Sequence, residues 1–272
     1  PPLMVLFLIV GPLYIAPLFN DFGRMQNRDL EAQILKLAER SGVPAARVFE
    51  VNKSADTKRA NAYVTGFGAS KRIVLWDTLS QKFAPEETLF VMAHEIGHYV
   101  LGHIYMGLAV ACVGAFALFY TARLALTRIL DSVGPRLGLQ SIHDPAILPL
   151  FFLIFSALMF MARPAGLAVS RINERAADRF ALELTRDRLA CANAFVRLQA
   201  TNLAHPAPAP WVVWLRSGHP TLAQRIQFCN EAPFENTTEN ATRATPAQSV
   251  TLKTSTVASS EKPFGPGFGS RM

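Results

Sequence analysis

The sequence predicts a mainly α-helical membrane protein in which several membrane-spanning helices carry a mixed α/β part with a small sheet. Half of the 272 residues are hydrophobic and only 17% are charged, and the mean hydropathy is +0.21. The apolar residues are bunched into long blocks, which alternate with strongly charged blocks. This pattern excludes a disordered chain, a collagen and a small disulfide scaffold.

Three apolar segments approach the ~20 residues that are needed to cross the core of a bilayer. They cover residues 1–19, 104–122 and 146–169. The first lacks the basic region and cleavage site of a signal peptide, so we interpret it as a span truncated at its start. Buried helices of a soluble core are the alternative, but segment 104–122 is apolar on every face. The charged stretch 123–145 is predicted to be a loop.

Residues 20–103 predict the mixed α/β part. Apolar positions on one face of residues 27–40 predict a helix, which stops before a glycine and a proline. A short strand is expected at 48–51. Residues 61–65 and 71–76 predict two more strands, joined by a glycine-rich turn as a hairpin. A further helix begins near Pro85, which is followed by two acids in its first turn.

Residues 170–230 predict a second charged part, with helices at 170–184 and 187–201 and a short helix that starts near Pro220. Between the last two lies a proline-rich loop. From residue 231 onward bulky apolar residues become rare, and twelve of the last 42 residues are Ser or Thr. We therefore expect residues 231–272 to be disordered.

Charge and cysteine content restrict the classes of partner and compartment. The net charge is +7, which together with long apolar segments favours anionic lipid headgroups over nucleic acid. No nucleic-acid-binding motif is present. The three cysteines, Cys112, Cys191 and Cys229, are too few and too scattered for a disulfide framework. We expect them to be free thiols in a reducing compartment.

His94, Glu95 and His98 form the pattern H-E-x-x-H. Residues four apart share one face of a helix, so both imidazoles can bind one metal ion while Glu95 reaches the attacking water. Two surface histidines on an ordinary helix are the alternative. On a continuous helix His103, nine residues after His94, points to the opposite face, and we expect it at the membrane interface.

A catalytic zinc site needs a third protein ligand and an open position. Glu174 is the candidate, because it directly follows the third span, whereas the H-E-x-x-H helix directly precedes the second. A helical hairpin in the bilayer would bring the two together. Asp178 lies one turn further and can accept the outer N–H of a metal-binding histidine. The alternative is a solvated pair of acids.

Four blocks together resemble a known family: residues 61–79, the H-E-x-x-H helix, residues 170–178, and residues 217–220 with Arg225 and Ile226. The chain is similar over roughly residues 10–230 to the type I CAAX prenyl proteases, which are integral-membrane zinc metalloproteases of the gluzincin group. The heat-shock-type membrane proteases of bacteria share the zinc motifs, but the block 61–79 favours the prenyl proteases. The resemblance implies a zincin-like α+β catalytic domain with a small β-sheet, divided between residues 20–103 and 170–230.

The resemblance also implies roles for the residues that match. One Zn²⁺ per chain is expected on His94, His98 and Glu174. Glu95 is expected to activate the attacking water, and His219 to stabilise the transition state.

Substrate contacts are expected from Asn61 and Ala62, on an edge strand that pairs with extended peptide, and from Arg225. The implied activity is a membrane-embedded zinc metalloendopeptidase that cleaves peptides or proteins, with prenylated CAAX ends as the narrower substrate class. A membrane-protein quality-control endopeptidase is the first alternative. A non-catalytic membrane scaffold is the second, although Glu95 and Glu174 are both present.

The distribution of Lys and Arg predicts the topology. Residues 20–95 contain eleven and residues 170–230 contain eight, whereas the stretch 123–145 contains three. Since short loops rich in Lys and Arg stay in the cytoplasm, we expect both catalytic parts to face it. The expected location is the inner (cell) membrane of a bacterium.

Overall fold

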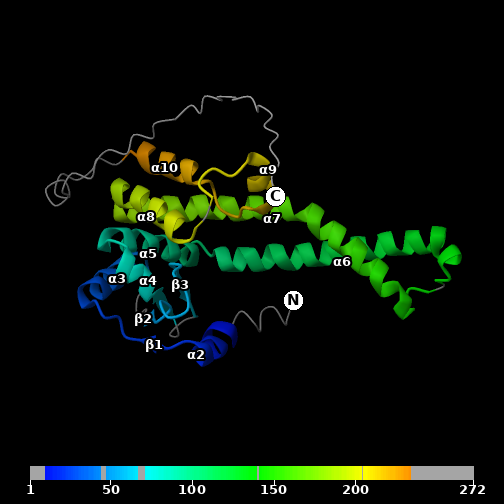
Figure 1. Ribbon diagram of the computed structural model, residues 1–272, viewed down its shortest axis with the longest axis horizontal. Helices are drawn as coiled ribbons and strands as arrows, with labels where there is room; N and C mark the ends of the chain where they lie inside the picture. Colours follow the sequence, from blue (N-terminus) through cyan, green and yellow to red (C-terminus); the bar gives the residue numbers. More distant parts are fainter. Residues whose placement is uncertain (1–9, 44–46, 67–70, 140, 204, 234–272) are drawn as a thin grey trace, which may run out of the picture. The chain divides into compact units, whose positions relative to one another are not determined.

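The computed structural model describes residues 10–43, 47–66, 71–139, 141–203 and 205–233, which are mostly helical with one small mixed sheet (Figure 1). The mostly helical class with a small sheet was predicted. Residues 1–9 of the first predicted span lie outside the described residues, as does the predicted disordered tail from residue 234 onward. The described remainder of that first segment forms a π-helix, η1 (Gly11–Ile15), followed by α2 (Ala16–Phe19).

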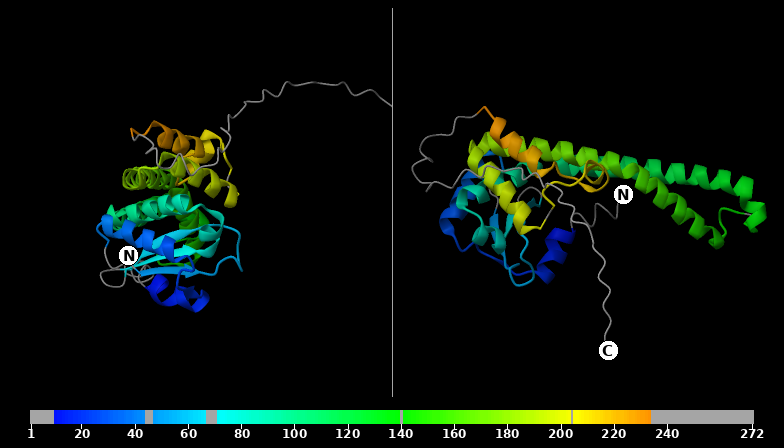
Figure 2. Two further views of the ribbon diagram at one scale, coloured as in Figure 1. Left: turned by 90° about the vertical axis from the view of Figure 1, so that its left-hand side faces the viewer. Right: turned by 45° about the horizontal axis from the view of Figure 1, so that its top comes forward.

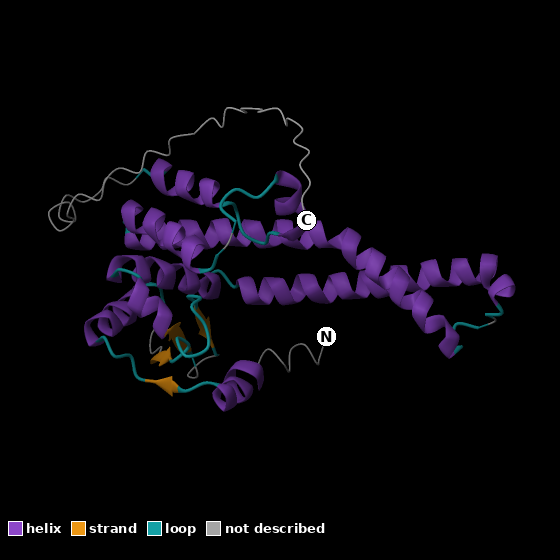
Figure 3. Cartoon of the chain, viewed as in Figure 1, coloured by secondary structure: helices purple, strands orange, loops and turns teal. Residues whose placement is uncertain are grey.

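The strands, orange in Figure 3, form one sheet, and its strand order is β1-β2-β4-β3. Its strands are β1 (Phe22–Gly23), β2 (Arg47–Val51), β3 (Ala62–Thr65) and β4 (Arg72–Trp76). β2 and β4 are parallel, and the other two pairs are antiparallel. The predicted strand at 48–51 and the predicted hairpin are therefore confirmed. Within the described chain β3 is an edge strand, so one row of its backbone groups is open to pairing.

Asp77 fastens the loop after β2 to the short helix α4 (Asp77–Lys82), which was not predicted. Its Oδ1 accepts the backbone N–H groups of Lys53 and Ser54 at 2.9 Å each. Burial alone raises the pKa of this carboxyl, but the hydrogen bonds to the charged form outweigh burial and lower the pKa overall. Next to it, the N–H of Trp76 donates to the carbonyl of Asn61 at 3.0 Å, which positions the residue before β3.

Helix α5 (Pro85–Val100) is the central element of the core. Proline occupies its first position, and the Glu87 carboxylate accepts the N–H of Ala84 at 3.0 Å. Phe90, Met92 and Ile96 are fully buried, and the helix packs against α7, α8, β3 and the predicted helix α3 (Arg28–Arg40). The H-E-x-x-H motif therefore sits on a helix that is held on several sides.

Two long helices, α6 (His103–Leu137) and α7 (Leu148–Thr185), pack against each other and extend away from the sheet (Figure 1). Both are long and apolar enough to cross a membrane, and the most apolar stretch of each helix is almost entirely unburied. The predicted loop at 123–145 is mostly wrong, because α6 continues to Leu137. Its charged residues are separated by Leu, Ala and Ile, and the helix ends only at Gly138, which has a φ of 72°.

The remaining helices lie on the side of α5 away from the sheet (Figure 2). They are α8 (Arg188–Thr201), α9 (Pro210–Arg216) and α10 (Leu222–Glu231). α8 packs against both α5 and α10, and α9 packs against α7. α8 and α10 were predicted. α9 was assigned to the proline-rich loop, although proline at a first helical position is a helix-start signal.

Candidate metal centre

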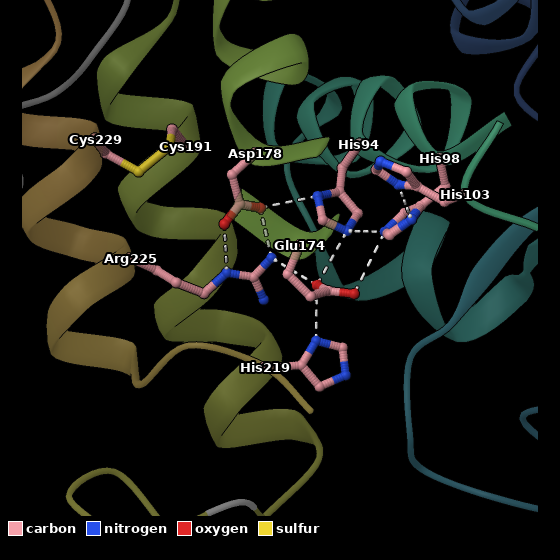
Figure 4. Close-up of polar contacts among 9 residues, drawn as sticks. All are labelled: His94, His98, His103, Glu174, Asp178, Cys191, His219, Arg225 and Cys229. Carbon is pink, nitrogen blue, oxygen red and sulfur yellow. Dashed lines mark hydrogen bonds and ion pairs between the residues drawn. A yellow bond between two sulfur atoms is a disulfide. The ribbon is translucent and has the colours of Figure 1, made fainter. Parts of the chain in front are cut away.

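His94 and His98 lie one turn apart on α5, with their rings 4.7 Å apart in an edge-to-face arrangement. Their Nε2 atoms are 3.1 Å from each other, so both offer the same ring nitrogen to one point (Figure 4). Gly97 lets the neighbouring helix come close here, since a Cβ at this position would lie 3.0 Å from the Phe180 ring of α7.

Glu174 of α7 completes the cluster. Its Oε2 lies 3.5 Å from Nε2 of His94, and its Oε1 lies 3.4 Å from Nε2 of His98. One ligand atom from each of the three residues falls within 4.8 Å of the others. Two imidazoles and one carboxylate, converging from two helices, are a donor set that fits a catalytic zinc ion. The residues could thus hold one metal ion between α5 and α7.

Asp178 stands behind His94, with Oδ1 at 2.8 Å from Nδ1. Burial alone would lower the pKa of His94, but the carboxylates of Asp178 and Glu174 outweigh it and raise the pKa to about 10. The two acids therefore create a strongly cation-attracting site.

Arg225 of α10, for which we expected a substrate contact, directs its guanidinium to the acids of α7. Nε donates to Asp178 Oδ2 at 2.9 Å, and Nη2 donates to Asp178 Oδ1 at 2.5 Å and to Glu174 Oε2 at 3.3 Å. The guanidinium also lies 4.0 Å from the ring centroid of Phe195. Because its contacts are to these acids, Arg225 is placed to hold the carboxylates of the cluster in position.

Glu95 and Glu174 line two cavities that meet at the cluster. The larger, of about 490 Å³, is also lined by Asn61 and Ala62 at the start of the edge strand β3. The smaller, of about 350 Å³, is lined by later residues of the same strand. Burial raises the pKa of the Glu95 carboxyl, as a general base working near neutral pH requires.

His219 lies in the turn between α9 and α10 and points into the site (Figure 4). Its Nδ1 is 2.7 Å from Glu174 Oε2, and 65% of its side chain is exposed. It also lines the larger cavity. The structure thus places the sequence-predicted site residues other than Asp178 in the walls of the two cavities or in the cluster between them. Asp178 contacts the cluster through Nδ1 of His94.

His103 does not point to the opposite face, and the expectation that it does is wrong. Its Nδ1 lies 2.9 Å from Nδ1 of His98, and it lines the smaller cavity. The prediction assumed a continuous helix, whereas α5 ends at Val100 and Gly102 adopts a left-handed conformation with a φ of 68°. A glycine after the last periodic residue is a helix-end signal that could have revealed this break.

The expectation of free thiols is wrong for two of the three cysteines. Cys191 of α8 and Cys229 of α10 form a disulfide, with Cα atoms 5.9 Å apart, and Cys112 is the free cysteine of the described chain. Both bonded residues are fully buried. Cys229 follows Arg225 by one helical turn, so the disulfide ties down the helix that carries Arg225 (Figure 4).

Alkylation tests this disulfide directly. In protein denatured without a reductant, iodoacetamide is expected to modify Cys112 alone, and after reduction it should modify all three cysteines. Reduction should also lower the melting temperature, because a disulfide of this kind contributes about 2–4 kcal/mol to stability. The variant Cys112→Ser is the control and should take up no label before reduction. Labelling of Cys191 or Cys229 in unreduced protein would contradict the prediction.

Comparisons with known proteins found metalloproteases that are similar to this chain. The family model described as peptidase family M48 matches residues 24–232. An uncharacterized metalloprotease of Bacillus subtilis, YhfN, is 42% identical over 85% of this chain and 54% of its own length. The CAAX prenyl protease 1 of Saccharomyces cerevisiae is 32% identical over 82% of this chain and 52% of its own.

A solved structure is similar as well. The crystal structure of S. mikatae Ste24p matches with a TM-score of 0.70 and 29% identity, over 84% of this chain and 56% of that one. The chain spans about half the length of the curated relatives it matches. Since the family model covers well over half of the chain, and a relative with 42% identity covers most of it, the chain belongs to peptidase family M48.

Proposed function

We propose that this protein is a membrane-embedded zinc metalloendopeptidase. The observation that carries the proposal is the convergence of His94, His98 and Glu174, whose ligand atoms lie within 4.8 Å of one another beside Glu95. One of the two apolar helices of spanning length, α6, directly follows α5, and the other, α7, itself carries Glu174, which supports a membrane location. A non-catalytic scaffold would need neither the ligand set nor the adjacent acid.

When bound, zinc would polarise the scissile carbonyl and lower the pKa of a water to about 7. Glu95 takes the proton of the attacking water and delivers it to the leaving amine, a role for which its raised pKa suits it. His219, at the mouth of the site, donates a hydrogen bond to the oxyanion that develops. Asp178, which contacts His94, and Arg225, which donates to Asp178 and Glu174, keep the ligands in place.

The substrate is held as an added strand. The edge strand β3 runs along the cluster, because Asn61 and Ala62 line the larger cavity while Tyr63 and Val64 line the smaller. An extended peptide paired to this edge passes from one cavity to the other and crosses Glu95 on the way. Main-chain pairing gives affinity for peptides in general, so side-chain selectivity comes from the cavities.

For the substrate class, we propose C-terminal peptides of prenylated CAAX-type proteins. The yeast relative is named CAAX prenyl protease 1, and the Arabidopsis thaliana relative is named CAAX prenyl protease 1 homolog. A general endopeptidase of membrane-protein quality control is the alternative, and it would be indifferent to a prenyl group.

A matched pair of peptides tests this proposal. Two quenched fluorescent peptides of one sequence, ending in a CAAX box and differing only in the prenyl group, are cleaved by purified protein in detergent. We expect cleavage of the prenylated peptide with the higher kcat/KM, and its loss on chelation and return with Zn²⁺. Equal kcat/KM for both peptides would favour the quality-control alternative. No chelator-sensitive cleavage of either peptide would reject the metalloendopeptidase itself.

The catalytic parts are proposed to face the cytoplasm, on the Lys and Arg distribution. The disulfide argues the other way, since disulfides persist in oxidising compartments. Labelling at position 132, near the C-terminal end of α6, distinguishes these two orientations. In a Cys112→Ser background, Ser132→Cys is expected to react with an impermeant maleimide in intact cells, whereas Ala55→Cys, before β3, should react only after the cells are opened. The reverse pattern would place the active site outside.

A further inference from the structure

The break between α5 and α6 brings a third histidine, His103, into contact with the metal-binding pair His94 and His98. α5 ends at Val100, Gly102 takes the left-handed conformation, and His103 is the first residue of α6. The ring of His103 packs edge-to-face on that of His98, with centroids 4.9 Å apart and Nδ1 atoms 2.9 Å apart (Figure 4). A non-glycine residue at 102 would be strained, so the turn that returns His103 depends on this glycine.

The direction of His98 makes this contact chemically specific. Its Nε2 faces Glu174 at 3.4 Å and His94 Nε2 at 3.1 Å, so Nε2 is its metal-facing nitrogen. A neutral imidazole that offers Nε2 to a metal carries its proton on Nδ1, and that N–H needs an acceptor. Nδ1 of His103, 2.9 Å away, is placed to accept it.

We propose that His103 is a positioning residue of the metal site, whose Nδ1 accepts the Nδ1–H of His98 and thereby sets the tautomer and ring orientation of that ligand. This inference rests on the proposed zinc site. The two histidines of the motif then have different partners at Nδ1. The partner of His94 is the Asp178 carboxylate, and the partner of His98 is the neutral imidazole of His103. The remaining ring proton of His103 is then on its Nε2, and the residue lines the smaller cavity.

His103 is not itself proposed as a metal ligand. Among the described residues, the group able to hold a metal comprises His94, His98 and Glu174 without it. Its Nδ1 is engaged by the outer nitrogen of His98, on the side of that ring away from Glu174. Its effect on the metal is therefore indirect, through the orientation and basicity of His98.

Metal affinity tests the inference without recourse to turnover. The dissociation constant of Zn²⁺ is measured by competition with a fluorescent chelator for the wild type and the variants His103→Leu and His103→Asn. Asn places its Oδ1 where His103 has Nδ1, and Leu places a methyl group there. We expect His103→Leu to bind zinc about 10- to 100-fold more weakly, and His103→Asn to stay within about threefold of the wild type. His143→Leu, in the connection between α6 and α7, is the control and should match the wild type.

The outcomes separate the inference from the function on which it rests. Wild-type protein that binds no stoichiometric zinc would reject the zinc site and the inference together. Tight zinc in the wild type with equal affinity in His103→Leu would overturn the inference alone. Equal weakening in the Leu and Asn variants would also overturn it, because packing and not the acceptor would then matter. If His103→Leu shows no thermal unfolding transition, His103→Ala replaces it in the same comparison.

Discussion

Glu95→Gln is expected to lower kcat by about 10²- to 10⁴-fold, which is the usual contribution of a general base. Glutamine keeps the size and shape of the side chain but cannot accept the proton of the attacking water. Glu95 lies beside the metal-binding cluster and lines both cavities, yet it is not one of the three ligands. Bound zinc should therefore remain at one ion per chain.

The measurement is kcat and zinc content on the same purified sample. Glu86→Gln, in the first turn of the same helix, is the matched control, because it removes an acid of α5 far from the cluster. It should leave both quantities unchanged. If Glu95→Gln kept wild-type kcat, another group would have to be the base. If it lost zinc, Glu95 would be a ligand and the ligand set would need revision.

Glu174→Gln is expected to remove zinc and activity together. The neutral amide is a poor replacement for an anionic ligand, and the change also removes the charge that holds His219 at 2.7 Å and Arg225 at 3.3 Å. Zinc that binds the folded state at 100 times its dissociation constant stabilises the protein by about 2.7 kcal/mol. The rise in melting temperature on adding zinc to the wild type should therefore be absent from the variant.

Thermal unfolding with and without added zinc measures this effect. Glu183→Gln is the control, because it is an exposed acid near the end of the same helix, α7. It should keep the zinc-dependent rise. Full zinc content and full activity in Glu174→Gln would show that the third ligand lies elsewhere.

The parts of the site that could be predicted are those that depend on local spacing. His94 and His98 meet because residues four apart share a helix face, and the apolar periodicity around them identifies the helix. The prediction of Glu174 as a ligand also required the argument that two spanning helices form a helical hairpin, and the resemblance of residues 170–178 to the family. The β3–β4 hairpin was predictable because its strands are joined by one short turn.

The parts that were missed depend on long-range contacts or on a change of direction. Arg225 and Asp178 are 47 residues apart in the sequence, and Cys191 and Cys229 are 38 residues apart. Over such separations the sequence pattern carries no information on which residues pair. His103 was misplaced because helical periodicity was extended through Gly102. The length of α6 was underestimated because its charges resemble those of a loop, although charges on a helix of spanning length can lie beyond the bilayer.

The helix α7 carries the apolar segment and Glu174 in one helix of 38 residues, with Pro164 between them. At 1.5 Å per residue this helix is about 57 Å long, nearly twice the ~30 Å hydrocarbon core that it is proposed to cross. A change in tilt of about 3° moves a point 20–25 Å along a rigid helix by about 1 Å, a displacement that can cost an enzyme about 10² in rate. Since spanning helices adjust their tilt to the thickness of the bilayer, we expect the acyl-chain length of the surrounding lipid to change the position of Glu174 relative to His94 and His98.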